Sequence, residues 1–179
     1  PRVWVCHVDT SSPNPRVTER LLPWIQGYSR VVFSSSDYFL RGLAPSQTVA
    51  IRPAIDPLTP KNRGLLPREA KAVLERLGMD TSRPIMTQVS RFDRWKDPLG
   101  VIQAYRLVKK EVPGVQLALV GVIVAMDDPE ALEVLAEVRQ AAGDDQDIHL
   151  FSDPSQVGDR EVAAFQQASD VVLQKSIRE

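Results

Sequence analysis

The chain has 179 residues, 43% of them hydrophobic and 25% charged, which is typical of a soluble globular protein with one domain or two small ones. The formal net charge of −1 gives no indication of a nucleic-acid or membrane partner, so any site for an anion must be local. Cys6 is the only cysteine, which excludes an internal disulfide and a zinc site built from thiolates, and which fits a cytoplasmic location.

Neither end of the sequence resembles a targeting or membrane-spanning segment. No apolar run approaches the roughly 18 residues that a membrane-spanning helix needs, and residues 1–10 lack the basic and apolar regions of a signal peptide. Strand-like runs instead occur at 3–8 and at 170–174, close to the two ends. Because domains seldom begin and end inside their sheets, we expect the chain to be an excerpt of a longer protein.

The first third of the chain alternates short apolar runs with helical patterns. We predict strands at 3–8, 30–34 and 48–51, a helix at about 16–27, and a short helical piece at 37–43. A proline-rich stretch follows at 52–67, and its composition is typical of a linker.

The remaining residues repeat this alternation with longer elements. A helix with Pro67 in its first turn is expected to end before Gly78, a typical C-terminal cap. Four apolar strands and three further helices are then predicted, the strands at 84–90, 115–121, 148–151 and 170–174 and the helices at 98–111, 129–142 and 159–168. Strands that are apolar throughout and alternate with helices predict an α/β fold, with a parallel sheet covered by helices on both faces.

The most informative stretch is VSRFDRWKDPLG, residues 89–100, which joins an apolar strand to a helix. Ligands of open parallel sheets bind beyond the carboxyl ends of the strands, where this stretch is expected to lie. Arg91 offers a planar fork to phosphate oxygens, and Lys96 offers a point charge. Asp97 is a good N-cap and Pro98 suits the first helical position, so a helix N-terminus should face the same region. This combination suits a diphosphate.

The residues alone leave two interpretations of this loop open. Its cations either bind phosphate or are solvated surface charges, since basic loops without a motif are common. The glycine patterns GxGxxG and GxxxxGK[ST] are absent, so neither a nicotinamide dinucleotide nor a P-loop is supported. The aromatic residues Phe92 and Trp95 are expected to pack against the strand rather than to stack on a base.

The segment SRFDRWKD resembles the diphosphate loop of retaining glycosyltransferases with two Rossmann-like domains, in which an arginine and a lysine five residues later hold the donor's phosphates. Arg91 and Lys96 match that spacing. Five segments more narrowly resemble trehalose synthases of the glycosyltransferring type. They are HVDTSSPNP (7–15), AIDPLTPKN (54–62), TQVSRFDRWKD (87–97), PGVQLALVGV (113–122) and ASDVVLQKSIRE (168–179). Fungal-type trehalose phosphorylases share several of these segments and are the alternative.

The resemblance implies a domain organisation. Residues 1–55 would be the end of an amino-terminal, acceptor-side Rossmann-like domain, and 56–66 a linker with Asp56 at the hinge. Residues 67–179 would be the first part of the nucleotide-sugar-binding domain, with its first four strands. Such a protein would be roughly twice as long as this chain.

The resemblance also implies a reaction: glucose passes from a nucleotide-diphosphate-glucose to free glucose, with retention of configuration, and trehalose forms. The partners would be the nucleotide sugar and glucose, and a homo-oligomer is allowed. No cofactor or metal would be required, because cationic side chains and helix N-termini stabilise the leaving diphosphate.

The family's site residues are carried over to the positions of this sequence that match. The candidate catalytic residues are His7, Arg91, Lys96 and Glu179, and the candidate donor-binding residues are Ser90, Arg91, Lys96, Gly121 and Glu179. His7 would contact the donor glucose, although a lone histidine at a strand end is otherwise typical of a hydrogen-bonded structural residue. Glu179 matches the first glutamate of a pair whose second member lies outside these 179 residues.

Other residues that could suggest chemistry have simpler interpretations. Asp145 and Asp147 form a DxD pattern, but they lie in an acidic connection between a helix and a strand, so we expect a solvated turn. His149 lies inside a predicted strand and is interpreted as structural.

Two functional hypotheses follow. The chain belongs either to a glucosyltransferase that makes trehalose, or to its phosphorylase relative, or it is a non-catalytic Rossmann-like piece that at most binds a nucleotide weakly.

Overall fold

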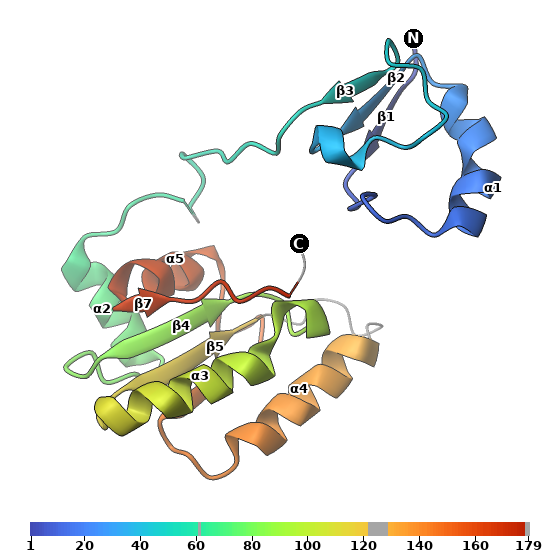
Figure 1. Cartoon of the computed structure of the whole chain (residues 1–179). Coiled ribbons are helices and arrows are strands. Elements are labelled where there is room, and N and C mark those ends of the chain that lie inside the picture. Colours follow the sequence, from blue (N-terminus) through green and yellow to red (C-terminus); the bar gives the residue numbers. More distant parts are fainter. Residues whose placement is uncertain (61, 122–128, 178–179) are drawn as a thin grey trace. The chain divides into compact units, whose positions relative to one another are not determined.

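The structure, a computed structural model, describes residues 1–60, 62–121 and 129–177. The chain forms two compact units, Pro1–Ile55 and Asp56–Glu179, each built around one parallel sheet (Figure 1). Among the helices that the structure describes, none combines the length and the apolar character needed to cross a membrane.

The first unit is a three-stranded parallel sheet with one α-helix. Its strands, in the order β1-β2-β3, are β1 (Val3–Cys6), β2 (Arg30–Phe33) and β3 (Thr48–Ala50). Helix α1 (Pro15–Gln26) joins β1 to β2, and the single 3-10 turn η1 (Ser36–Tyr38) follows β2. The turn takes the place of the longer helical piece predicted at 37–43.

The core of the first unit lies between its sheet and α1. It consists of Cys6, Ile25, Val31, Phe33 and Leu40, all less than 9% exposed. Helix α1 can begin at Pro15 because a proline has no N–H that must be paired there, and because the Asn14 side chain accepts hydrogen bonds from the next two backbone N–H groups.

The second unit is a four-stranded parallel sheet with helices on both faces. Its strands, in the order β6-β5-β4-β7, are β4 (Ile85–Val89), β5 (Gln116–Val120), β6 (Ile148–Phe151) and β7 (Val171–Val172). Its helices are α2 (Pro67–Arg76), α3 (Pro98–Glu111), α4 (Pro129–Ala142) and α5 (Asp159–Ala168), with the 3-10 turn η2 (Arg94–Lys96) before α3.

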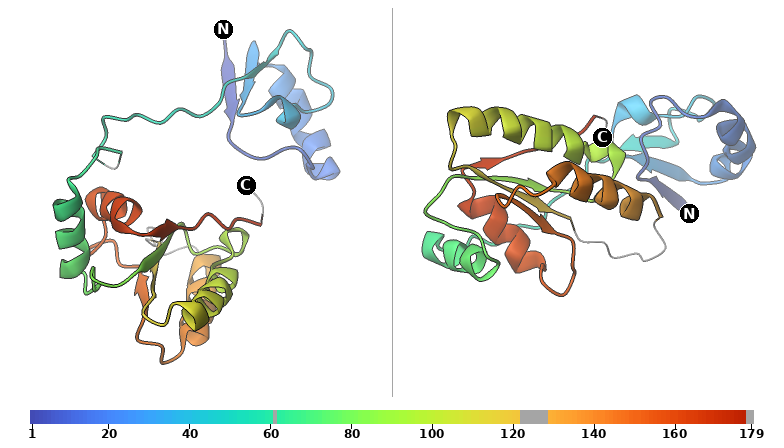
Figure 2. Two further views of the ribbon diagram at one scale, coloured as in Figure 1. Left: turned by 60° about the vertical axis from the view of Figure 1, so that its left-hand side comes forward. Right: turned by 90° about the horizontal axis from the view of Figure 1, so that it is seen from below.

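Strand β5 shows how the two faces are filled. Its residues are all buried, and they alternate between two clusters because successive side chains of a strand point to opposite faces. Leu117 and Leu119 pack in a cluster with α3 and α4, whereas Ala118 and Val120 pack in a cluster with α2 and α5. Figure 2 shows the two helix pairs on the two sides of the sheet. Because helices cover both faces of the sheet, a central strand such as β5 needs apolar side chains on both faces.

The structure confirms the predicted α/β fold with parallel, Rossmann-like sheets. Helices α3, α4 and α5 have the predicted bounds. Strand β7 is shorter than predicted, because only Val171 and Val172 are paired with β4. The chain from 173 to 177 instead runs past the end of β4, where it contacts the loop that follows β4.

Candidate active site

The loop at residues 90–97 leaves the carboxyl end of β4. It is anchored by Phe92, which is 3% exposed and belongs to the core between the sheet and α3 and α4. Trp95, which was also expected to pack, is 55% exposed, so that prediction is wrong. The two aromatics differ because only Phe92 points under the loop, whereas Trp95 lies in the short turn η2 above it.

One carboxylate joins the two candidate phosphate-binding cations. Asp93 Oδ2 lies 3.1 Å from an Arg91 guanidinium nitrogen, and Asp93 Oδ1 accepts a hydrogen bond of 3.0 Å from the backbone N–H of Lys96. The Arg91 side chain is nevertheless 78% exposed, so its donors remain accessible to a ligand. The loop therefore presents Arg91 and Lys96 from one fixed backbone.

The backbone of Lys96 is also held by a side chain of strand β4. The Gln88 side chain, 3% exposed within β4, donates a hydrogen bond of 2.6 Å to the Lys96 carbonyl oxygen. The Lys96 ammonium group donates to the Ser176 hydroxyl at 3.4 Å. Lys96 thus connects β4 to the segment that follows β7.

Helix α3 starts at this loop. Asp97 adopts the left-handed conformation, with φ of 45°, and its Oδ1 accepts a hydrogen bond of 3.0 Å from the backbone N–H of Gly100. Its Oδ2 forms an ion pair with Lys175. The predicted N-cap is confirmed, and the positive end of the α3 dipole lies next to the loop.

Ser90 and Gly121 lie beside each other at the same edge of the sheet. The Ser90 backbone N–H donates to Val120 at 2.9 Å, and a Cβ added to Gly121 would lie 2.9 Å from the Phe92 ring and even closer to the Ser90 carbonyl oxygen. The close approach of β5 to the loop therefore requires glycine at 121. The structure thus brings Ser90 and Gly121 together with the loop that carries Arg91 and Lys96.

The third cation of the loop, Arg94, contacts helix α4. Its guanidinium group donates hydrogen bonds of 2.9 and 3.2 Å to the two carboxylate oxygens of Glu137. The hydrogen bond and charge of Glu137 raise the pKa of Arg94. Arg94 is therefore engaged within the protein, unlike the largely exposed Arg91.

His7 belongs to the other unit, where it follows β1. Its side chain is exposed. Nearby, the Asp9 side chain accepts a hydrogen bond of 2.8 Å from the backbone N–H of Ser11 and so shapes the loop after β1. Glu179 lies outside the residues that the structure describes.

Beside the loop that follows β1 is a cavity of about 720 Å³, lined by both polar and apolar side chains, that sequence analysis did not identify. Its polar lining comes mainly from Thr10, Ser11, Ser12, Glu19, Asp37 and Arg41. The run of hydroxyl residues at 10–12 was the available signal, but the sequence does not reveal that Asp37 and Arg41 lie against it.

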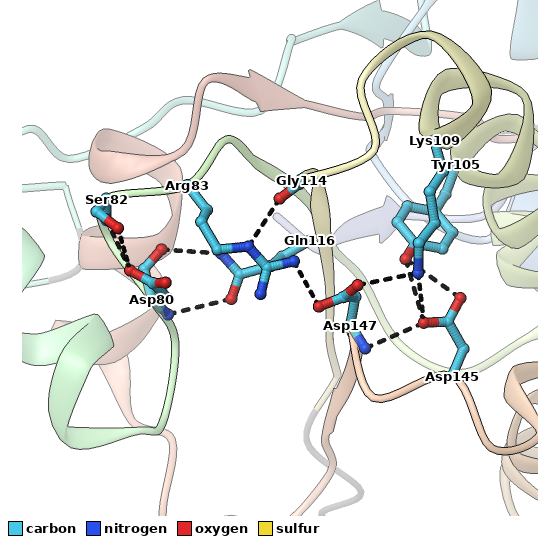
Figure 3. A network of polar contacts seen from close by, with 9 residues as sticks. All are labelled: Asp80, Ser82, Arg83, Tyr105, Lys109, Gly114, Gln116, Asp145 and Asp147. Atoms are coloured by element: carbon cyan, nitrogen blue, oxygen red, sulfur yellow. Dashed lines mark hydrogen bonds and ion pairs between the residues drawn. The ribbon is translucent and has the colours of Figure 1, made fainter.

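Asp145 and Asp147 are not a solvated turn, so that prediction is wrong. Lys109 lies 2.7 Å from Asp145 and 3.0 Å from Asp147, and Arg83 lies 2.5 Å from Asp147 (Figure 3). The network lies at the amino ends of β4, β5 and β6, the edge of the sheet opposite the 90–97 loop.

No group of three or more histidine, cysteine or acidic side chains suited to a metal occurs in the described part of the chain.

His149 lies within β6, as predicted. Its ring stacks on Phe151, with 6.4 Å between the centroids and 10° between the planes. Burial lowers the pKa of His149. Its position away from the 90–97 loop agrees with a structural role.

Comparison with known protein families identifies the family of the unit that carries the 90–97 loop. The family model described as "Glycosyl transferases group 1" matches residues 71–179, which include the 90–97 loop and all four strands of the second unit. The chain belongs to this family. The match confirms the resemblance on which the candidate site residues rest, but not the role of any single residue.

The relatives of this group 1 glycosyltransferase chain include proteins named trehalose synthase. The one from Rubrobacter xylanophilus is 49% identical over 99% of this chain and 42% of the relative. The one from Pyrococcus horikoshii is 45% identical over 100% of this chain and 43% of the relative. The chain therefore spans less than half the length of these relatives.

A solved structure shows the same fold. The crystal structure of Anabaena Alr3699/HepE in complex with UDP-glucose matches with a TM-score of 0.71, over 97% of this chain and 46% of that one, at 18% identity.

Proposed function

We propose that the protein containing this chain is a retaining glucosyltransferase, which transfers glucose from a nucleotide-diphosphate-glucose to free glucose and so forms trehalose. The observation that carries the proposal is the 49% identity to a trehalose synthase over 99% of the chain. The match covers 99% of the chain, so it includes both units and not only the one that carries the basic loop.

In the proposed reaction, the bond between glucose C1 and a diphosphate oxygen breaks, and its electron pair stays on the diphosphate. A bond forms between C1 and a hydroxyl oxygen of the acceptor glucose, whose proton passes to the departing diphosphate or to solvent. The transition state therefore gains negative charge on the phosphates and positive charge on the sugar ring.

The residues of the 90–97 loop suit the leaving diphosphate. The exposed Arg91 guanidinium can bind two phosphate oxygens at once, and the Lys96 ammonium adds a point charge on a backbone held by Asp93 and Gln88. A preorganised charge of this kind typically contributes about 10²-fold or more to the rate. His7 and Glu179 would act on the glucose being transferred, and the second glutamate would come from outside residues 1–179.

The test is an assay of the full-length protein with UDP-, ADP- and GDP-glucose as donors and glucose as acceptor. UDP-glucose is the first choice, because Alr3699/HepE was solved with it. Trehalose formation that persists in EDTA would support the proposal. Trehalose formed only from glucose 1-phosphate would indicate a phosphorylase instead, and complete loss of activity in EDTA would contradict the metal-independent chemistry.

A further inference from the structure

Two short segments, 78 residues apart in sequence, contact each other residue by residue beside the candidate diphosphate site. The backbone N–H of Ile177 donates a hydrogen bond of 2.7 Å to the carbonyl oxygen of Trp95. Ser176 accepts a hydrogen bond from Lys96, and Lys175 forms an ion pair with Asp97. The end of η2 and the segment after β7 are therefore held together by three successive contacts.

The ion pair lies at the most constrained point of this contact. Asp97 is the only described residue other than glycine with a positive φ, and its carboxylate caps α3. A Cβ added to Gly100 would lie 2.6 Å from the Lys175 ammonium nitrogen and would also collide with the Asp97 carboxylate. The close approach of Lys175 to Asp97 therefore depends on glycine at position 100.

The charge balance of the 90–97 loop indicates what Lys175 contributes. Within the described loop at 90–97, Arg94 is engaged by Glu137, the other cations are Arg91 and Lys96, and the anions are Asp93 and Asp97. These four charges cancel. A diphosphate approaching the N-terminus of α3 would then be repelled by the capping carboxylate, unless another cation neutralised that carboxylate.

We propose that Lys175 is a positioning residue for donor binding: it neutralises Asp97 and holds the helix cap and Lys96 in the arrangement that accepts a diphosphate. The inference rests on the proposed function. Lys175 acts through Asp97 rather than on the substrate, so its removal should weaken donor binding more than it affects folding. Ion pairs exposed to this extent, with a Lys175 side chain that is 47% exposed, contribute little to stability.

Lys175→Met in the full-length enzyme is expected to raise the Kd of the donor's nucleoside diphosphate, and the KM of the nucleotide sugar, about tenfold. Lys175→Arg keeps the charge and should remain close to wild type. Lys110→Met removes an exposed lysine from the other end of α3 and serves as the control. Calorimetry gives the Kd, initial rates separate KM from kcat, and melting temperatures report folding.

The decisive variant is Lys175→Met combined with Asp97→Asn. Asparagine keeps the side-chain oxygen that caps Gly100 but removes the negative charge, so the double variant should bind the diphosphate better than Lys175→Met alone. An active wild type whose affinity is unchanged by Lys175→Met, or is not restored by Asp97→Asn, overturns the inference while the proposed function stands. A wild type that transfers no glucose overturns both.

Discussion

The guanidinium group of Arg91 lies 3.1 Å from the carboxylate of Asp93, yet the Arg91 side chain remains 78% exposed. The ion pair orients Arg91 without enclosing it. Asp93 also accepts a hydrogen bond from the backbone of Lys96, so a single side chain fixes the spacing between the two cations. This is the kind of preorganisation that anion recognition requires.

Arg91→Ala and Lys96→Ala in the full-length protein are therefore expected to weaken nucleoside diphosphate binding by about 1.5–3 kcal/mol each, the usual range for a charge-assisted hydrogen bond. Their melting temperatures should change little, since exposed charges contribute within about 0.5 kcal/mol. Calorimetric titration with UDP or ADP measures the binding.

Arg94→Ala is the internal control for these two variants. Because Arg94 is bound to Glu137, its loss should lower the melting temperature slightly and leave diphosphate affinity near wild type. Equal losses of affinity in all three variants would reduce the loop to a diffuse basic patch. Unchanged affinity in the Arg91 and Lys96 variants would remove the diphosphate site.

Gly121→Ala should destabilise the second unit by about 1–3 kcal/mol, because the added methyl group meets the Ser90 carbonyl oxygen and the Phe92 ring. Gly114→Ala is the matched control: a Cβ there has no neighbour within 4 Å, and the change should be neutral or stabilising by up to about 1 kcal/mol. Urea denaturation compares the two. A Gly121→Ala protein as stable as the control would contradict the close packing between β5 and the loop.

The sequence was sufficient to predict helices α3, α4 and α5 of the second unit. Its helices have Pro98, Pro129 and Asp159 in their first turns and apolar residues at helical spacing, so both their bounds and their buried faces follow from local patterns. The α/β fold follows in turn, because strands as apolar as β5 need helices on both sides.

Contacts between distant side chains could not be predicted in the same way. The Lys175–Asp97 pair spans 78 residues and the Arg94–Glu137 pair spans 43, and no local pattern specifies either partner. The expectation for Asp145 and Asp147 failed for the same reason: an acidic turn appears solvated unless Arg83 and Lys109 are known to face it. Burial of Phe92 but not of Trp95 likewise depends on the path of the loop.

The 179-residue chain by itself is expected to show no glucose transfer. It spans 42–43% of the trehalose synthases that it matches, and the proposed mechanism needs a second glutamate from outside it. Large apolar side chains such as Trp24, which is 76% exposed, should also promote self-association. Size-exclusion chromatography and the donor assay test both points. Turnover by a mass-verified 179-residue monomer would contradict the requirement for further residues.

The ion network around Asp147 should make the second unit sensitive to acid. Burial alone would raise the pKa values of Asp145 and Asp147, but hydrogen bonds and charges from Lys109 and, for Asp147, Arg83 outweigh burial and lower both. Carboxylates with lowered pKa values stabilise the fold above the unfolded-state pKa of about 3.9, and this contribution is lost as the pH falls through the folded-state values. The pKa of Lys109 is raised, mainly by hydrogen bonding to Asp145, so its contribution is lost only in strong alkali.

Asp147→Asn is therefore expected to reduce the free energy of unfolding at pH 7 by about 1–2 kcal/mol, because it removes the ion pairs with Arg83 and Lys109 while keeping the shape of the side chain. The difference from wild type should shrink as the pH falls below about 4, where the wild-type carboxylates also become protonated. Urea denaturation of the full-length protein between pH 3 and pH 8 measures this convergence. Asp144→Asn, which changes the exposed neighbouring carboxylate, should follow the wild-type curve throughout. A constant difference between Asp147→Asn and wild type across this range would show that the loss does not come from the charge of Asp147.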